Sequence, residues 1–171
     1  MIETNNLQLL PVERIHIKAF LSSKSELAKL LQVTVPSNWP HFPHAFSLPD
    51  DESLPLPNGW NGYFFIHSQQ AVLVGNGGFK GQPNESGIVE IGYEIAAEYW
   101  NRGLATEAVQ GLIDYAFDRE EVRAVNAHTL GETNASNRVL QKVGMRFVSN
   151  VAHSQLGTIW LWEIDRASAN R

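Results

Sequence analysis

Two glutamates on one predicted strand carry carboxylates that could take part in proton transfer. The stretch IVEIGYEIAA, residues 88–97, alternates apolar and polar positions as a half-buried strand does. Successive side chains of a strand point to opposite faces, so Glu90 and Glu94 share one face with Gly92. A carboxylate held in this way can act as a general base. Both glutamates are candidates for that role, and the competing interpretation is a pair of solvated residues.

The segment after this strand has the features of an anion site. In YWNRGLATEA, residues 99–108, the alternation stops, a short turn with one glycine follows, and a helix begins. The first N–H groups of a helix have no intrahelical partner and carry a partial positive charge. A phosphate or diphosphate suits such a cluster, because Gly103 and Ala105 leave it uncovered. The donors would come from Arg102, Gly103, Leu104, Ala105 and Thr106. The alternative is a glycine needed only for a tight turn.

The rest of the chain must supply a sheet that carries these two features. Alternating apolar residues predict strands over 5–12, 62–68, 71–81, 88–96, 122–130, 145–153 and 158–165. Apolar residues three and four apart predict helices over 12–31 with a break near Ser22, over 104–118, and over 134–144. This order predicts an α+β, three-layer fold with a mixed, mostly antiparallel sheet of six to seven strands flanked by helices.

A proline-rich segment interrupts the regular elements at residues 36–60. Its proline density excludes a regular helix or an interior strand. A long loop in a compact domain is usually functional or disordered, and the aromatic residues of this one favour packing. We expect it to wall a substrate pocket, with a purely structural cover as the alternative. The glycine-rich run GNGG at residues 75–78 precedes turn residues instead of a helix, so it indicates a bulge in a strand.

Composition limits the classes of protein that the sequence can encode. The chain has 171 residues, which suits one domain over 1–171. It has no cysteine, which rules out disulfides and thiolate nucleophiles and favours the cytoplasm. The net charge of −5 argues against a general nucleic-acid surface, and no apolar run is long enough to span a membrane. His41 and His44 lack a third ligand at metal-site spacing, so no metal is expected.

The junction described above resembles a known family. YWNRGLATEA looks like motif A of the GNAT N-acetyltransferases, and VEIGYEIAAEYW with NASNRVLQKVGMRFV is similar to the ribosomal-protein alanine N-acetyltransferases. The resemblance covers residues 88–148 and implies acetyl-CoA as cosubstrate, with its diphosphate on the N–H groups of residues 102–106. It also implies that strand 90–96 splays from strand 122–130. The pantetheine arm would then pair with the free edge near Ile95 and Ala96.

The same resemblance assigns catalytic roles. It favours Glu90 over Glu94 as the general base, and it places Ser136 near the coenzyme sulfur, where it could return a proton. Asn134 would bind the pantetheine amides or cap its helix, and Arg138 would approach the phosphates or remain solvated. The sequence departs from the family pattern at Gln141, where many relatives carry a tyrosine that protonates the leaving thiolate. Trp100 also replaces a polar residue, which this subgroup tolerates.

These observations predict an enzyme that transfers acetyl from acetyl-CoA to a primary amine. Since no cysteine can carry the acetyl group, direct attack in a ternary complex is expected. The acceptor would be a small molecule or a peptide amine. The alternative is a catalytically silent acyl-CoA-binding or regulatory module of the same fold, which Gln141 favours. Trp160 and Trp162 alternate in the last strand and would lie in the core or on an oligomer surface, such as that of a homodimer.

Overall fold

The computed structural model describes residues 1–43 and 59–169 of the chain. Most of the proline-rich segment lies outside these residues, so its expected part in a substrate pocket is not tested by the structure. The segment before this gap, residues 32–43, packs Trp39 into the core with no exposed surface. Trp39, and Trp60 after the gap, therefore pack as expected, whereas Phe42 is 68% exposed and Phe46 lies outside the described residues.

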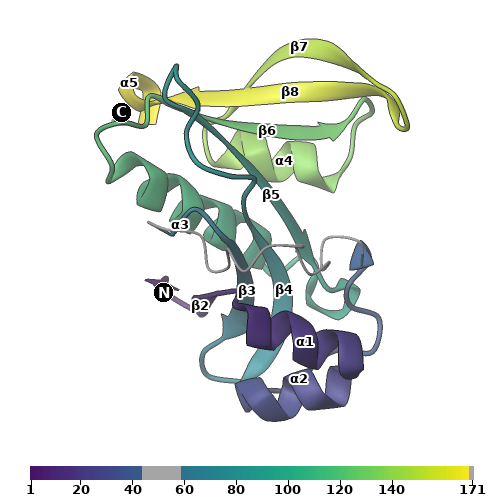
Figure 1. Ribbon diagram of the computed structural model, residues 1–171. Coiled ribbons are helices and arrows are strands. Elements are labelled where there is room, and N and C mark those ends of the chain that lie inside the picture. Colours follow the sequence, from purple (N-terminus) through teal and green to yellow (C-terminus); the bar gives the residue numbers. More distant parts are fainter. Residues whose placement is uncertain (44–58, 170–171) are drawn as a thin grey trace.

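One sheet of eight strands forms the centre of the molecule (Figure 1). In spatial order its strands are β1 (Ile2–Glu3), β2 (Leu7–Pro11), β3 (Gly62–His67), β4 (Val72–Phe79), β5 (Ile88–Ile95), β6 (Ala124–Leu130), β8 (Gly157–Asp165) and β7 (Arg146–His153). Seven of them match the predicted strands, and the mixed α+β fold is confirmed. The predicted count of six to seven was too low, because the two residues of β1 are too few to show alternation.

Helices cover both faces of the sheet. On one face α1 (Arg14–Ser22) and α2 (Lys24–Leu31) pack over β3 and β4, and they lie at the bottom of Figure 1. Ser23 separates them, and its side chain accepts a hydrogen bond from the N–H of Glu26, which confirms the predicted break. On the other face α3 (Leu104–Phe117) and α4 (Ala135–Lys142) bury their apolar sides, and α5 (Arg166–Ala169) ends the described chain. We name these the α1–α2 face and the α3–α4 face.

The strands keep the predicted alternation. In β5 the side chains of Val89, Ile91 and Ile95 pack into the core of the α3–α4 face. In β8 Trp162 is buried on the same face, and its indole N–H donates to the Thr129 hydroxyl at 2.9 Å. Trp162 therefore takes the core role rather than the surface role.

The centre of the sheet divides where β5 and β6 meet. These two strands are parallel, and they pair only from Ile88–Ala124 to Ile91–Ala127. Beyond that point β5 continues to Ile95 against β4 alone, while β6 continues to Leu130 against β8. Figure 1 shows the two strands close together at one end and diverging toward the other. This is the expected splay, and it leaves part of one edge of β5 without a neighbouring strand.

Candidate active site

The turn before α3 has the geometry of an anion cradle. Gly103 occupies the N-cap position with a φ of 78°, a left-handed conformation that glycine adopts without strain. A Cβ built at this position would meet no atom within 4 Å, so the space above the turn is open. The first intrahelical bond is donated by the N–H of Glu107 to Gly103 O at 3.0 Å. The N–H groups of residues 104–106 therefore precede the hydrogen-bonded part of the helix and are available to a ligand.

The positively charged side chains near this turn differ in how they are placed relative to the start of α3. Arg102 donates from Nη2 to Glu98 O at 3.0 Å, and its guanidinium lies 4.9 Å from the centroid of the Tyr99 ring. In this conformation it braces the turn and does not reach over the helix end. Lys142 of α4 lines a groove of about 740 Å³ together with Gly103 and Thr106, whereas Arg138 is exposed and outside that lining. The sequence suggested both cations for the phosphates, and of the two only Lys142 lines this groove.

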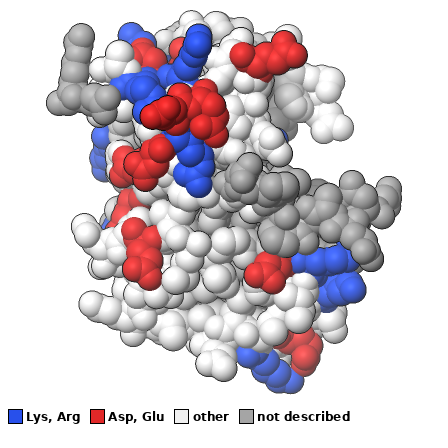
Figure 2. Space-filling view, turned by 60° about the vertical axis from the view of Figure 1, so that its left-hand side comes forward, with Lys and Arg blue, Asp and Glu red and all other residues white. Residues whose placement is uncertain are grey.

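A broad electrostatic field does not replace these local donors. On the face shown in Figure 2, Lys and Arg side chains lie interspersed with Asp and Glu side chains. Opposite charges in such proximity largely cancel at a distance. This face therefore offers no large region of a single charge sign to attract an anion.

The free edge of β5 exposes a different pair of residues from the predicted one. The N–H of Lys80 donates to Glu90 O at 2.9 Å and the N–H of Ala96 donates to Val74 O at 2.8 Å, so even-numbered residues of β5 bond toward β4. The alternation of a strand then turns the backbone groups of Tyr93 and Ile95 toward the gap.

Two backbone carbonyl groups at the end of β5 already have hydrogen-bond partners. Ile95 O accepts from the Trp100 indole at 2.7 Å, and Ala96 O accepts from the N–H of Tyr99 at 2.9 Å. Ala96 thus has both backbone groups engaged, and its predicted pairing with a pantetheine arm is not supported. Tyr93 and the N–H of Ile95 remain for that role.

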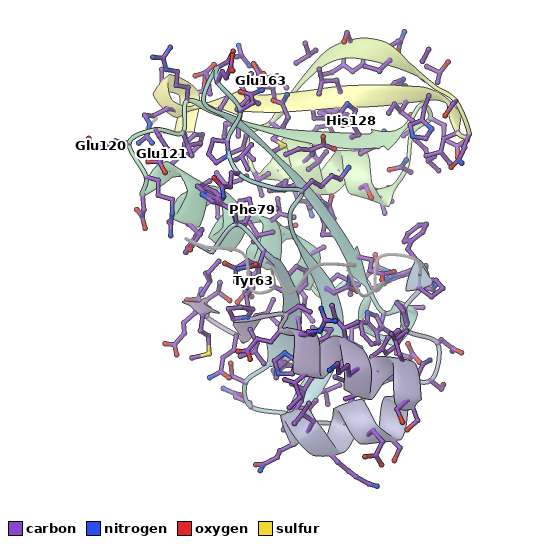
Figure 3. The ribbon with its side chains drawn as sticks, in the orientation of Figure 1. Tyr63, Phe79, Glu120, Glu121, His128 and Glu163 are labelled. Atoms are coloured by element: carbon purple, nitrogen blue, oxygen red, sulfur yellow. The ribbon has the colours of Figure 1, made fainter. Side chains whose placement is uncertain are left out.

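A carboxylate and an imidazole meet across the division of the sheet. Glu90 Oε1 lies 2.8 Å from Nδ1 of His128, and the same oxygen accepts a hydrogen bond from Lys80. Burial opposes ionisation of Glu90, but the hydrogen bonds from Lys80 and His128 outweigh it and lower the pKa of the carboxyl. His128 projects from β6 just beyond its last residue paired with β5 (Figure 3). Each arm of the split therefore contributes one titratable group.

Sequence reasoning did not single out His128. The only signal available was its place in the predicted strand 122–130, on the same face as Asn126, which pairs in register with Glu90. That signal depends on knowing that the two strands are neighbours.

Glu94 lies in a different environment from Glu90. Its side chain is only 8% exposed, although it is in the part of β5 that β6 has left. Oε2 accepts a hydrogen bond from the N–H of His41 at 2.9 Å, and Oε1 has no partner among the described residues. Burial is the main cause that raises the pKa of this carboxyl above its usual value. Of the two candidate bases, one is charged and paired and the other is buried and half-satisfied.

The α3–α4 face brings two hydroxyl-bearing residues together. The Tyr93 hydroxyl donates to the backbone carbonyl of Ser136, in the first turn of α4, at 3.2 Å. Burial raises the pKa of Tyr93 to about 12, so the phenol stays protonated in the neutral range. Ser136 is half-buried, while Gln141 on the same helix is exposed. The protein thus places a phenol beside the serine that the sequence predicted as a proton donor.

Asn134 serves as the cap of α4. Its Oδ1 accepts from the N–H of Asn137 at 3.1 Å, and its Nδ2 donates to Glu132 O at 3.1 Å. Of the two roles considered for Asn134, the structure shows capping, and both polar groups of the side chain are already engaged.

The described residues also bear on two other classes of site. Among residues 1–43 and 59–169, no group of three or more His, Asp or Glu side chains is arranged to hold a metal ion. In the same residues, none of the helices combines the length and the apolar character needed to cross a bilayer. His41 lies with its ring centroid 6.0 Å from that of Trp100, and His44 is outside the described residues.

Comparison with known proteins identifies the family. Residues 8–146 match the model of the acetyltransferase (GNAT) domain. The uncharacterized N-acetyltransferase YjdG of Bacillus subtilis (strain 168) is 26% identical over 148 residues, which are 84% of this chain and 88% of that protein.

Solved structures share the fold at low identity. RimL, a ribosomal L7/L12 α-N-protein acetyltransferase solved with coenzyme A, has a TM-score of 0.67 at 13% identity, over 95% of each chain. Spermidine N-acetyltransferase from Vibrio cholerae, solved with CoA and spermine, has a TM-score of 0.67 at 14% identity, over 98% of this chain and 100% of its own. The family model covers most of the chain, and the chain therefore belongs to the GNAT family of acetyl-CoA-dependent N-acetyltransferases.

Proposed function

We propose that this protein transfers the acetyl group of acetyl-CoA directly to a primary amine, with proton acceptors and proton donors on opposite faces of the divided sheet. The observation that carries the proposal is the position of these groups. Glu90 and His128 meet at 2.8 Å across the split on the α1–α2 face, and Tyr93 reaches Ser136 on the α3–α4 face. An amine that enters from the first face and a thiolate that leaves toward the second would each meet a suitable partner.

The coenzyme would be held by backbone groups of the protein. The N–H groups of Leu104, Ala105 and Thr106 would bind its diphosphate, with Lys142 at the border of the groove. Tyr93 and the N–H of Ile95 would bind the pantetheine amides along the free edge of β5. This arrangement would hold the thioester where β5 and β6 separate. A bound amine held against it there would react as if the two were parts of one molecule.

The chemical step then needs two proton transfers. The neutral amine nitrogen forms a bond to the carbonyl carbon, and the bond from that carbon to sulfur breaks. Glu90, with His128 beside it, would accept the proton that the nitrogen loses. Ser136 and Tyr93 would supply a proton to the departing sulfur, which compensates for the absence of a tyrosine at Gln141. No covalent acetyl-enzyme is needed, in keeping with a chain that has no cysteine.

The cost of deprotonation differs between the two classes of acceptor. A peptide α-amine with a pKa of about 8 costs about 1 kcal/mol to neutralise at pH 7, whereas a lysine-like amine with a pKa of about 10.4 costs about 5 kcal/mol. Relatives of this fold include one that acts on a protein N-terminus and one solved with spermine. We include both small amines and peptide N-termini as acceptors, and we place the reaction of this single domain, residues 1–171, in the cytoplasm.

The competing function is an acyl-CoA-binding or regulatory module without catalysis. Gln141 favours it, because an amide cannot protonate a thiolate. Two measurements made in parallel separate the functions: calorimetric binding of acetyl-CoA, and release of free CoA with the mass of the product for a panel of amines. Binding with an acetylated product supports the transferase. Binding without product for every amine supports the silent module, and absence of binding contradicts both.

A further inference from the structure

We propose that Glu94 binds a second cationic group of the acceptor, so that the enzyme selects amines with a further alkylammonium chain. This inference rests on the proposed transfer to an amine and adds the class of acceptor. The chemistry recognised is an alkylammonium group, which a free diamine and a lysine side chain both present.

The first argument is the incomplete hydrogen bonding of a buried carboxyl group. Glu94 is 8% exposed, its Oε2 accepts from the N–H of His41 at 2.9 Å, and the backbone N–H of Phe42 also acts on the carboxyl group. Oε1 is buried with no hydrogen-bond partner in the described part of the chain. Buried polar atoms are nearly always paired, so this unpaired carboxyl oxygen calls for an explanation, and a donor from a bound ligand would supply one.

The second argument is that no Lys or Arg side chain of the described residues forms an ion pair with this carboxylate, although the electrostatic attraction of His41 lowers the pKa of Glu94. The ion pairs found among residues 1–43 and 59–169 join Glu26 to Lys29, Glu90 to Lys80 and His128, and Asp165 to Arg146. None of them involves Glu94. A buried carboxylate without a counter-ion is destabilised, and an ammonium ligand would relieve that penalty.

The third argument is the position of Glu94 relative to the reacting groups. Glu94 lies on the same face of β5 as Glu90, four residues further along the strand, which is about 13 Å between Cα atoms. It is in the segment of β5 that no longer pairs with β6, so the strand edge beside Glu94 borders the split. An acceptor whose reactive nitrogen lies beside Glu90 can therefore place a second nitrogen at Glu94, if several bonds separate the two.

The surroundings of Glu94 suit an alkylammonium chain. The ring of Trp100 lies 6.0 Å from that of His41, whose backbone N–H donates to Glu94, and the face of a tryptophan attracts cations. Asn76 is the register partner of Glu94 on β4, and its Oδ1 accepts from the Trp39 indole at 2.7 Å. That hydrogen bond holds the Asn76 side chain in place on the strand next to Glu94.

Two other roles for Glu94 give different kinetics. A general base acts on every acceptor, so its loss lowers kcat for all amines. A purely structural acid contributes to folding alone, and its replacement by an amide of the same shape leaves acceptor preference unchanged. A cation anchor acts only on acceptors with a second charge, and its loss raises their KM.

The experiment compares amines matched in length. We would measure kcat and KM for butylamine and hexylamine against 1,4-diaminobutane, 1,6-diaminohexane and 1,8-diaminooctane, and for the peptide Ala-Lys against Ala-Leu. The variants are Glu94→Gln and, as a matched control, Glu98→Gln, which changes an exposed carboxylate close by in sequence. Thermal unfolding of each variant checks that it is folded.

We expect the protein to favour the dication over the matched monoamine by about ten- to a hundredfold in kcat/KM, the range of a buried hydrogen bond to a charged group. Glu94→Gln should remove this preference through KM and leave monoamine kcat unchanged, while Glu98→Gln should keep it. Preference for Ala-Lys alone would identify a peptide as the source of the chain, and preference for the diamines a small molecule. An equal loss of kcat for all amines, or no change, would overturn the inference.

A binding measurement distinguishes failure of the cation site from failure of the proposed acetyl transfer. Calorimetric binding of 1,6-diaminohexane to the CoA-bound protein tests the cation site without turnover. Binding that disappears in Glu94→Gln supports the site even if no amine is acetylated, and no binding to the unmodified protein contradicts it.

Discussion

The substitution Thr106→Glu separates coenzyme binding from folding. Thr106 is partly buried in the first turn of α3 and lines the groove beside Gly103. A glutamate there would interact favourably with the helix dipole, by about 0.3–1 kcal/mol, so the fold should be unchanged or slightly more stable. The same carboxylate would stand where the diphosphate binds. Two unit charges about 4 Å apart repel by about 1 kcal/mol in water and by about 4 kcal/mol at an effective dielectric constant of about 20.

These energies convert to a loss of affinity for acetyl-CoA between about fivefold and several hundredfold. The assay is isothermal titration calorimetry, with thermal unfolding measured on the same samples. Thr106→Gln is the matched control, because it adds the same bulk without the charge. Weaker binding in Thr106→Glu than in Thr106→Gln, at equal stability, is the expected result. Equal affinity in the two variants would refute the placement of the diphosphate at this helix end.

Three further perturbations test other parts of the structure. Glu90→Gln should lower kcat by about a hundredfold or more and leave acetyl-CoA affinity within about twofold, in steady-state and binding assays; unchanged kcat would remove Glu90 from the mechanism. Tyr93→Phe should lower kcat about tenfold while unfolding stability changes by about 1 kcal/mol, the value of one hydrogen bond; full activity would leave Ser136 or water as the donor. Glu107→Gln should cost about 1–3 kcal/mol in urea unfolding at pH 7, because Glu107 accepts from the Thr4 hydroxyl at 2.6 Å. Partial burial opposes ionisation of Glu107, but hydrogen bonds from Asn6 and Thr4 outweigh it and lower its pKa, so this difference should shrink as the pH falls below about 4. A difference that stays constant with pH would contradict that assignment.

The parts of the fold that sequence reasoning predicted depend on local chemistry. Gly103 was placed in a turn at a helix start, and its φ of 78° is a conformation that glycine favours. The α3 stripe and the alternation of β5 also follow from spacing alone. The division between β5 and β6 came from family resemblance and is confirmed by the limits of their pairing.

The parts that were missed depend on contacts between distant residues. His128 and Glu90 are 38 positions apart, and nothing local to either one indicates their contact. In the sequence Glu94 is one polar position of an ordinary alternating strand. Its hydrogen-bond partner in the structure, the backbone N–H of His41, is 53 positions away. Ala96 lies on the expected edge, but its backbone groups are engaged by Val74 and Tyr99. Short-range patterns assign the elements, and the tertiary packing decides which groups remain available to a ligand.

A crystal structure of the protein with coenzyme A bound would test the central claim most directly. The distances to measure join the diphosphate oxygens to the backbone nitrogens of Leu104, Ala105 and Thr106, and the sulfur to the hydroxyls of Ser136 and Tyr93. We predict diphosphate contacts of about 2.7–3.2 Å to at least two of the three nitrogens, with the sulfur between β5 and β6. A coenzyme bound with its diphosphate away from the start of α3, or with its sulfur outside the divided strands, would contradict the account.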